Sequence, residues 1–251
     1  MTKKIILSIQ NVFKQFGEKK VHQGVSFDLY SGEILALFGG SGSGKSVILR
    51  SLIGLEKPDS GSIIFENKDI AKMNDFDLID VRKKIGYVFQ NGALFDSMTV
   101  AENLAYPLLE HTDYSDTVIT EKITEMLDLI GLKGSEQLLP ASLSGGMQKR
   151  VGAARAIILG PKIILYDEPT AGLDPFNTQR LLELMRSIQR RPGEHSAIFV
   201  THDIPAAFEV ADRVAILAKG KIHTIDTVEN IKKSNDPFVK AFISGEETSH
   251  L

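Results

Sequence analysis

The chain contains no cysteine among its 251 residues. Disulfide bonds and zinc sites built on thiolates are therefore excluded, although this absence does not identify the compartment. The sequence has no apolar run near the roughly 18 residues that a membrane-spanning helix needs. Its formal net charge is only -3, so the composition does not indicate a broad nucleic-acid-binding face, and we expect no nucleic acid partner.

The first ten residues place two lysines before a short apolar stretch, which loosely resembles an export signal. The stretch ends at Gln10, which makes it too short for the apolar region of such a signal, and no small-residue cleavage site follows. We therefore expect a cytoplasmic chain. Any role at a membrane then requires a partner that supplies the spanning helices.

Short apolar runs alternate with helical patterns along the chain. The expected strands are 5–9, 25–29, 33–38, 62–65, 85–89, 162–166, 197–200 and 214–217. The expected helices are 44–53, 119–130, one that begins with Pro175, and 227–242 with an interruption near Pro237. Between about 94 and 157 the strand-like runs disappear, which indicates a helical lobe inserted into an α/β core. The alternation predicts a mainly parallel sheet that is covered on both faces.

The segment Gly39–Ser46 fits the phosphate-loop pattern G-x-x-x-x-G-K-[ST]. Its glycines let the backbone curl so that several N–H groups point at a triphosphate, and the following helix adds its positive N-terminal end. Lys45 is expected to reach the β- and γ-phosphates, and the Ser46 hydroxyl to ligate Mg²⁺. A flexible loop with a chance lysine is the alternative, but a strand before and a helix after favour ATP binding. The residues expected to bind it are Gly39, Gly40, Ser41, Gly42, Ser43, Gly44, Lys45 and Ser46.

A later apolar strand ends in two acids, Asp167 and Glu168. A buried strand carries its last side chains to the C-terminal edge of the sheet, where α/β proteins bind ligands. Asp167 is then placed to hold Mg²⁺ through water, and Glu168 to take a proton from the attacking water or to orient it. The alternative, a strand with a solvated acidic end, is disfavoured by the phosphate loop upstream.

Three further polar residues are weaker candidates when taken singly. Gln90 follows an expected strand and either touches the metal or the water, or is a plain loop amide. His202 follows another strand and either donates to the γ-phosphate or is an ordinary surface histidine. Asp174 precedes Pro175 and can simply cap the helix that begins there.

The segment Leu143–Met147 reads Leu-Ser-Gly-Gly-Met. Alone, it is a loop in which Ser144 caps a helix that runs through Arg155. Placed between the phosphate loop and the acidic strand end, it makes the sequence resemble ABC-type ATPases over nearly its whole length. The matching elements are the phosphate loop Gly39–Ser46, the Q-loop Gln90, the signature Leu143–Met147, the acids Asp167 and Glu168, the D-loop Ala171–Asp174 and the switch His202.

The resemblance implies a P-loop NTPase (RecA-like) α/β core with an N-terminal antiparallel β region and an inserted α-helical lobe. We expect one ABC ATPase domain over 1–251, with the core at 1–93 and 158–251 and the lobe at 94–157. The resemblance also implies a homodimer that closes head-to-tail around two ATP molecules, with the signature of one copy on the γ-phosphate held by the other.

The same resemblance assigns roles to individual residues. The expected catalytic residues are Lys45, Gln90, Glu168 and His202; the expected metal ligands are Ser46, Gln90 and Asp167; Ser144, Gly145, Gly146 and Asp174 join the phosphate loop in nucleotide binding. Phe16 lies 29 residues before Lys45, where the family places an aromatic ring that stacks on adenine. Tyrosine is commoner than phenylalanine at this position of the family. Phe13 is the alternative residue for stacking on adenine, and either phenylalanine can instead belong to the hydrophobic core.

Four longer segments of the sequence point to one group within the ABC family. They are Gln90–Leu108, Leu143–Ile157, Tyr166–Pro175 and Ser234–Gly245. They resemble the MlaF-type, Mkl-type and Ttg2A-type ATPases of Mla and MCE-associated phospholipid-trafficking systems, which maintain outer-membrane lipid asymmetry. This implies ATP and Mg²⁺ as cofactors. It also implies a MlaE-type permease, a MlaD-type lipid-binding protein and a small MlaB-type subunit as partners, at the cytoplasmic face of the bacterial inner membrane.

The segment after Gln90 is expected to receive the permease's coupling helix on the apolar residues Ala93, Leu94, Phe95 and Met98; the alternative is that these residues pack inside the lobe.

Rival functions are an ABC ATPase for another small-molecule cargo, a non-transport ABC protein and a P-loop small-molecule kinase. Long insertions or tandem ATPase units would favour a non-transport ABC protein, and the chain has neither. A kinase would leave Leu143–Met147 and His202 unexplained.

Overall fold

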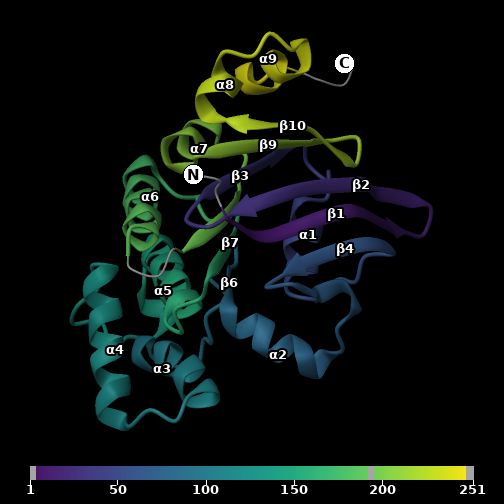
Figure 1. Ribbon diagram of the computed structural model, residues 1–251. Coiled ribbons are helices and arrows are strands. Elements are labelled where there is room, and N and C mark those ends of the chain that lie inside the picture. Colours follow the sequence, from purple (N-terminus) through teal and green to yellow (C-terminus); the bar gives the residue numbers. More distant parts are fainter. Residues whose placement is uncertain (1–3, 192–194, 247–251) are drawn as a thin grey trace.

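The computed structural model describes residues 4–191 and 195–246, so the first three residues of the N-terminal stretch lie outside the described residues. Helices and strands alternate along most of the chain (Figure 1). The strands are β1 Ile5–Phe16, β2 Lys19–Tyr30, β3 Ile34–Gly39, β4 Ser60–Phe65, β5 Lys68–Asp69, β6 Ile85–Val88, β7 Ile163–Asp167, β8 Ser196–Val200, β9 Arg213–Ala218 and β10 Lys221–Thr227. The α-helices are α1 Lys45–Leu52, α2 Asp75–Lys84, α3 Val100–His111, α4 Asp116–Leu129, α5 Gly145–Ile157, α6 Pro175–Gln189, α7 Ile204–Val210, α8 Val228–Lys232 and α9 Pro237–Ser244.

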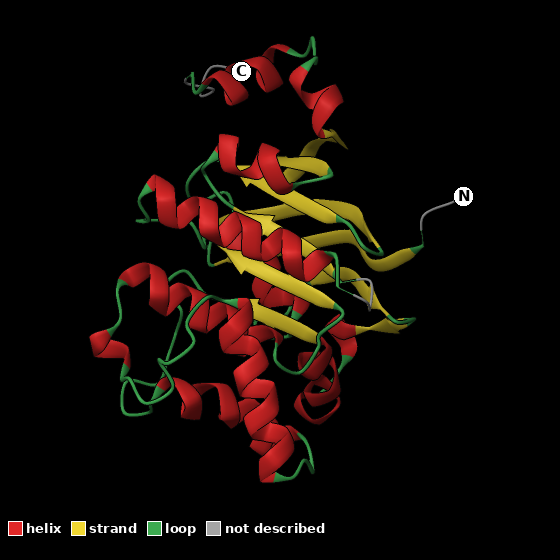
Figure 2. Cartoon of the chain, turned by 90° about the vertical axis from the view of Figure 1, so that its left-hand side faces the viewer, coloured by secondary structure: helices red, strands yellow, loops and turns green. Residues whose placement is uncertain are grey.

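The larger sheet has the order β10-β9-β3-β8-β7-β6, and all its neighbours are parallel except β10 and β9. The predicted, mainly parallel sheet is therefore confirmed. Side chains of successive strand residues point to opposite faces, so β3 serves two cores. Ile34, Ala36 and Phe38 pack with the helices α3–α9, whereas Leu35 and Leu37 pack with α1 and the second sheet. Figure 2 shows the helices laid across one face of the strands.

The second sheet is antiparallel and has the order β2-β1-β4-β5. The prediction of short strands at 5–9 and 25–29 was wrong in length, because β1 and β2 each continue for 12 residues. An irregularity in the β1–β2 register between Ile9 and Val12, with Asn11 at a φ of 48°, breaks the alternation on which the shorter prediction relied. The N-terminal antiparallel β region expected from the resemblance is present.

Three helices, α3, α4 and α5, form the region between β6 and β7, and this part of the described chain contains no strand. A capping box fixes the start of α3, since Thr99 accepts from the Glu102 N–H and the Glu102 carboxylate accepts from the Thr99 N–H. Arg150 of α5 donates to the Ile130 carbonyl at the end of α4. These bonds and the shared apolar core join the three helices into one lobe (Figure 1).

The backbone of α5 touches the loop that follows β6 without an intervening side chain. A Cβ atom on Gly152 would lie 2.7 Å from the Gly92 carbonyl oxygen, and one on Gly92 would lie 3.0 Å from the Gln148 carbonyl oxygen. Only glycine on both sides permits this approach.

We expect Gly152→Ala to lower the free energy of unfolding by about 1–3 kcal/mol, because the added methyl group must displace the backbone at Gly92. Gly145→Ala on the same helix is the matched control, since its Cβ would meet nothing within 4 Å. Urea unfolding of the two variants and the wild type measures the difference. Equal unfolding midpoints would show that the contact has no energetic role.

The predicted C-terminal helix is two helices, α8 and α9, and Pro237 begins α9 rather than interrupting it, as the fixed φ of proline suits a first helical turn. The sequence did not predict two of the strands, β5 and β10, or three of the α-helices, α2, α3 and α7. No helix in the described part of the chain combines the length and apolar character needed to cross a membrane.

Candidate active site

The phosphate loop joins β3 to α1, as the sequence predicted, and its glycines are required by close contacts. A Cβ on Gly39 would lie 2.7 Å from the Leu217 carbonyl oxygen. Gly44 has a φ of 100° and would place a Cβ 2.6 Å from His22 Nε2. Substituting a larger residue at either position therefore forces the loop to move.

Lys45 is almost fully buried and bends back over this loop. Its Nζ donates to the carbonyl oxygens of Gly39, at 2.8 Å, and of Gly40, at 3.1 Å. Burial lowers the pKa of Lys45 from its ordinary value, and the Glu168 and Asp167 carboxylates oppose that shift. The loop thus holds a cation inside its curve, where an anionic ligand would meet it.

A cavity of about 490 Å³ opens over the loop, within the size range of small-molecule sites. It brings together many of the predicted residues; those that line it are Phe16, Ser41, Gly42, Gly44, Lys45, Ser46, Gln90, Glu168 and His202. The hydroxyl oxygen of Ser43 is buried and has no hydrogen-bond partner among the described residues. These features fit a ligand rich in phosphate oxygens.

Asp167 lies at the end of β7 and bonds to two hydroxyl groups. Its Oδ1 accepts from Ser46 Oγ at 2.9 Å, and its Oδ2 accepts from the Tyr87 hydroxyl at 2.7 Å. Ser46, Asp167 and nearby Gln90 offer only oxygen ligands, which suit a hard divalent cation. Among the described residues, no group of three or more histidine, cysteine, aspartate or glutamate side chains is arranged to hold a metal ion. Proteins usually bind Mg²⁺ through one or two carboxylates together with phosphate oxygens of the substrate.

Glu168 directly follows β7 and is held in the left-handed region, with a φ of 51°. Its N–H donates to the Val200 carbonyl at 2.9 Å, and its Oε2 accepts from the His202 N–H at 3.2 Å. His202 Nε2 lies 3.0 Å from Glu168 Oε1. The histidine that the sequence assigned to the γ-phosphate thus contacts the glutamate in this structure.

Lys149 is a buried residue of α5 that the sequence analysis missed. Its Nζ donates to the Pro169 carbonyl oxygen at 3.0 Å and also to that of Ala171. Burial lowers its pKa, and the Glu168 carboxylate opposes this. The sequence holds no signal for these bonds, because both acceptors are backbone carbonyls. Lys149 connects that helix to the turn that immediately follows Glu168.

The two candidate aromatic residues for adenine lie in different places. Phe16 lines the cavity over the phosphate loop, and the Lys14 ammonium lies 4.9 Å from its ring centroid. Phe13 lines a different cavity, and its ring lies against Gly24. The geometry therefore favours Phe16.

The signature residues and Asp174 do not line this cavity, whereas Ala171, the first D-loop residue, does. Ser144 caps α5 by accepting from the Met147 N–H at 3.3 Å, and Asp174 caps α6 by accepting from the Asn177 N–H at 3.0 Å. Gly145 is exposed, while Gly146 packs against Asn177. One copy of the chain therefore does not bring these residues to its own phosphate loop.

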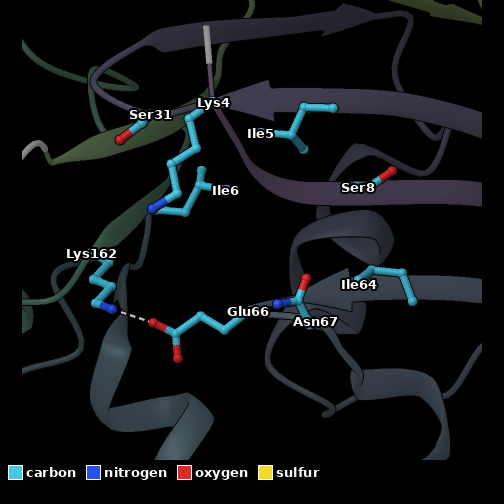
Figure 3. A pocket seen from close by; sticks show the side chains of 9 residues that line it. All are labelled: Lys4, Ile5, Ile6, Ser8, Ser31, Ile64, Glu66, Asn67 and Lys162. Atoms are coloured by element: carbon cyan, nitrogen blue, oxygen red, sulfur yellow. Dashed lines mark hydrogen bonds and ion pairs between the residues drawn. The ribbon is translucent and has the colours of Figure 1, made fainter.

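A second cavity, of about 510 Å³, opens between β1, β4 and the start of β7 (Figure 3). Lys162 lines it and donates to Glu66, which also accepts from Lys84 at 2.6 Å. It lies at the amino end of the parallel strands, whereas ligands of open α/β sheets bind at the carboxyl ends. We therefore place the active site at the phosphate loop.

Comparisons with known proteins agree with this geometry. The ABC transporter family matches residues 22–171. The "Probable ribonucleotide transport ATP-binding protein mkl" of Mycobacterium leprae is 39% identical over 241 residues, 96% of this chain and 69% of the relative. The "Intermembrane phospholipid transport system ATP-binding protein MlaF" of Haemophilus influenzae is 34% identical over 241 residues, 96% of this chain and 91% of the relative.

A solved structure extends the match to three dimensions. The ATP-binding cassette MJ0796, a dimer in a post-hydrolysis state bound to ADP and Pi, superposes with a TM-score of 0.81 and 31% identity, covering 88% of this chain and 98% of that one. The ATPases of this family form dimers and partner with membrane permeases. The predicted resemblance and fold class are thus confirmed, and the chain belongs to the ABC transporter family as an ATPase coupled to transport.

Proposed function

We propose that this chain hydrolyses Mg²⁺-ATP as a homodimer and powers phospholipid movement through a MlaE-type permease. The observation that carries the proposal is the separation of the two halves of the site, since the phosphate loop forms a cavity without the signature residues. The similarity to the Haemophilus influenzae phospholipid transport ATPase over 96% of the chain supports the cargo. Within one domain we assign 1–93 and 158–251 to the core and 94–157 to the helical lobe.

In this mechanism the loop N–H groups and Lys45 bind the phosphates, and the ring of Phe16 stacks on the adenine. Ser46 and Asp167, with Gln90 nearby, would hold Mg²⁺, and the cation would supply charge neutralisation at the transferred phosphoryl group. Glu168 accepts a proton from the attacking water or orients it, and His202 positions Glu168 and donates to the γ-phosphate on closure. The contact between His202 and Glu168 supports this pairing.

The second copy completes each site with Ser144, Gly145, Gly146 and Asp174. The N-terminus of α5 carries the positive end of a helix dipole, which attracts the γ-phosphate of the facing copy. Release of that phosphate removes the bridge between the copies, and the dimer opens.

We expect Ser144→Ala to lower kcat about 10-fold, because a hydrogen bond to a charged phosphate is lost, while ATP binding to the isolated chain changes less than about twofold. Ser142→Ala is the matched control, since Ser142 is exposed, lies two residues away and stands outside the helix cap. Phosphate release and nucleotide titration measure the two quantities. A parallel loss of binding in Ser144→Ala would place the signature at its own phosphate loop instead.

The loop after Gln90 supports a docking surface for the permease, at the cytoplasmic face of the inner membrane. Phe95 is 41% exposed, and its ring lies 5.1 Å from that of Tyr106. Ala93 is also exposed, whereas Leu94 packs against the core of the lobe. Leu94 therefore packs inside the lobe, which was the alternative to its docking role. Met98, the fourth residue assigned to this surface, is half-buried.

The decisive experiment is co-purification of the chain with a MlaE-type permease, followed by identification of bound lipid and assay of ATP-driven lipid movement in vesicles. A MlaD-type and a MlaB-type protein are the further partners to test in the same preparation. Ribonucleotide is the alternative cargo, which the description of the Mycobacterium leprae relative suggests. Transport of ribonucleotide without lipid would overturn the phospholipid assignment and leave the ATPase intact.

A further inference from the structure

The strands β6 and β7 place a tyrosine beside the acid that ends β7. Tyr87 pairs with Leu165 in the parallel register, and Val88 pairs with Tyr166. Because alternate residues share a face, Tyr87, Leu165 and Asp167 project to one side of the sheet and Tyr166 to the other. Tyr87 thus approaches the Asp167 carboxylate through the fold and not through nearness in the sequence.

The contact is a charge-assisted hydrogen bond. The Tyr87 hydroxyl donates to Asp167 Oδ2 at 2.7 Å, and the tyrosine ring packs on Phe89 with ring centroids 4.3 Å apart. The hydroxyl hydrogen is thereby directed at the carboxylate.

The second oxygen of the same carboxylate reaches the phosphate loop. Asp167 Oδ1 accepts from Ser46 Oγ at 2.9 Å, so the Ser46 proton is committed to Asp167. The lone pairs of Ser46 Oγ are then free to face a cation. If Oδ2 were not held, the carboxylate could rotate and release this orientation.

We propose that Tyr87 is a positioning residue for the divalent cation, acting through Asp167 to hold Ser46 Oγ ready as a metal ligand. This inference rests on the proposed Mg²⁺-ATP site. Partners that orient metal ligands from outside the coordination shell typically change metal affinity about 10–100-fold when removed. We expect the lower end of that range, because Asp167 itself remains.

The test compares Tyr87→Phe with Tyr166→Phe, a matched control. The Tyr166 hydroxyl is buried without a hydrogen-bond partner in the described structure, on the neighbouring strand and the opposite face. Each variant loses one hydroxyl oxygen and keeps its ring. The affinity for Mn²⁺ is measured by electron paramagnetic resonance with a non-hydrolysable ATP analogue bound, so that no turnover is needed. Nucleotide affinity is measured separately in excess chelator.

We expect Mn²⁺ affinity to fall about 10-fold in Tyr87→Phe and to change less than twofold in Tyr166→Phe. Metal-free nucleotide affinity should be unchanged in both. Wild-type Mn²⁺ affinity in Tyr87→Phe, or an equal loss in both variants, would overturn the positioning role alone. If the wild type itself bound neither nucleotide nor Mn²⁺, the proposed function would fail together with this inference.

Discussion

Glu168→Gln is expected to lower kcat at least 100-fold while two copies still associate when ATP is added. The amide cannot accept a proton from water, and general-base catalysis typically contributes about 10²–10⁴-fold. The amide keeps the size of the side chain, so the phosphate loop and Lys45 remain available to bind ATP. Phosphate release measures the rate, and light scattering after chromatography measures association.

Two outcomes of this experiment separate the possible roles of Glu168. Turnover at the wild-type rate would remove Glu168 as the base, whereas slow turnover without association would indicate a damaged site. Glu121→Gln is the control, because Glu121 lies exposed on α4. That variant should match the wild type in both measurements.

Lys45→Ala is expected to weaken ATP binding by about 10–100-fold, which corresponds to the roughly 1.5–3 kcal/mol of a hydrogen bond to a charged group. In the structure the ammonium is nearly buried and already lies inside the loop, bonded to the Gly39 and Gly40 carbonyls. Its removal takes from the phosphates the one charged side chain inside the loop, while the backbone N–H groups remain. Titration with a fluorescent ATP analogue measures the loss.

The internal bonds of Lys45 require a structural check on this variant. Thermal unfolding without nucleotide shows whether the loop depends on Lys45 for its own shape. Lys133→Ala, an exposed lysine paired with Asp128, should change neither quantity. Undiminished ATP affinity in Lys45→Ala would contradict the central role of the phosphate loop.

Much of the candidate nucleotide site could be proposed from the sequence because its signals are local. The glycines, Lys45 and Ser46 lie in one continuous segment, and the close contacts at Gly39 and Gly44 explain why the segment needs them. The buried strand that ends at Asp167 is likewise visible as an apolar run. Its ends shifted by one residue, from 162–166 to Ile163–Asp167, which is a normal uncertainty at element boundaries.

Other features depend on strand order and could not be read from the sequence. The bond between Tyr87 and Asp167 exists because β6 lies beside β7, although many residues separate them. Lys149 was missed because its partners are backbone carbonyls, which carry no residue-specific signal. The strand β10 was missed because its exposed edge position removes the apolar run that marks a buried strand.

The direct backbone contact between Gly92 and Gly152 has a mechanical consequence. Side chains that separate two elements can change rotamer and so absorb a displacement of one element. Two peptide groups in contact have no rotamers to change. A displacement of the loop after Gln90 would therefore press directly on α5, which Ser144 caps and whose Lys149 bonds to the turn after Glu168. With a permease docked on this loop, as proposed above, the loop would act on the signature end of α5 with no side chain between the two backbones.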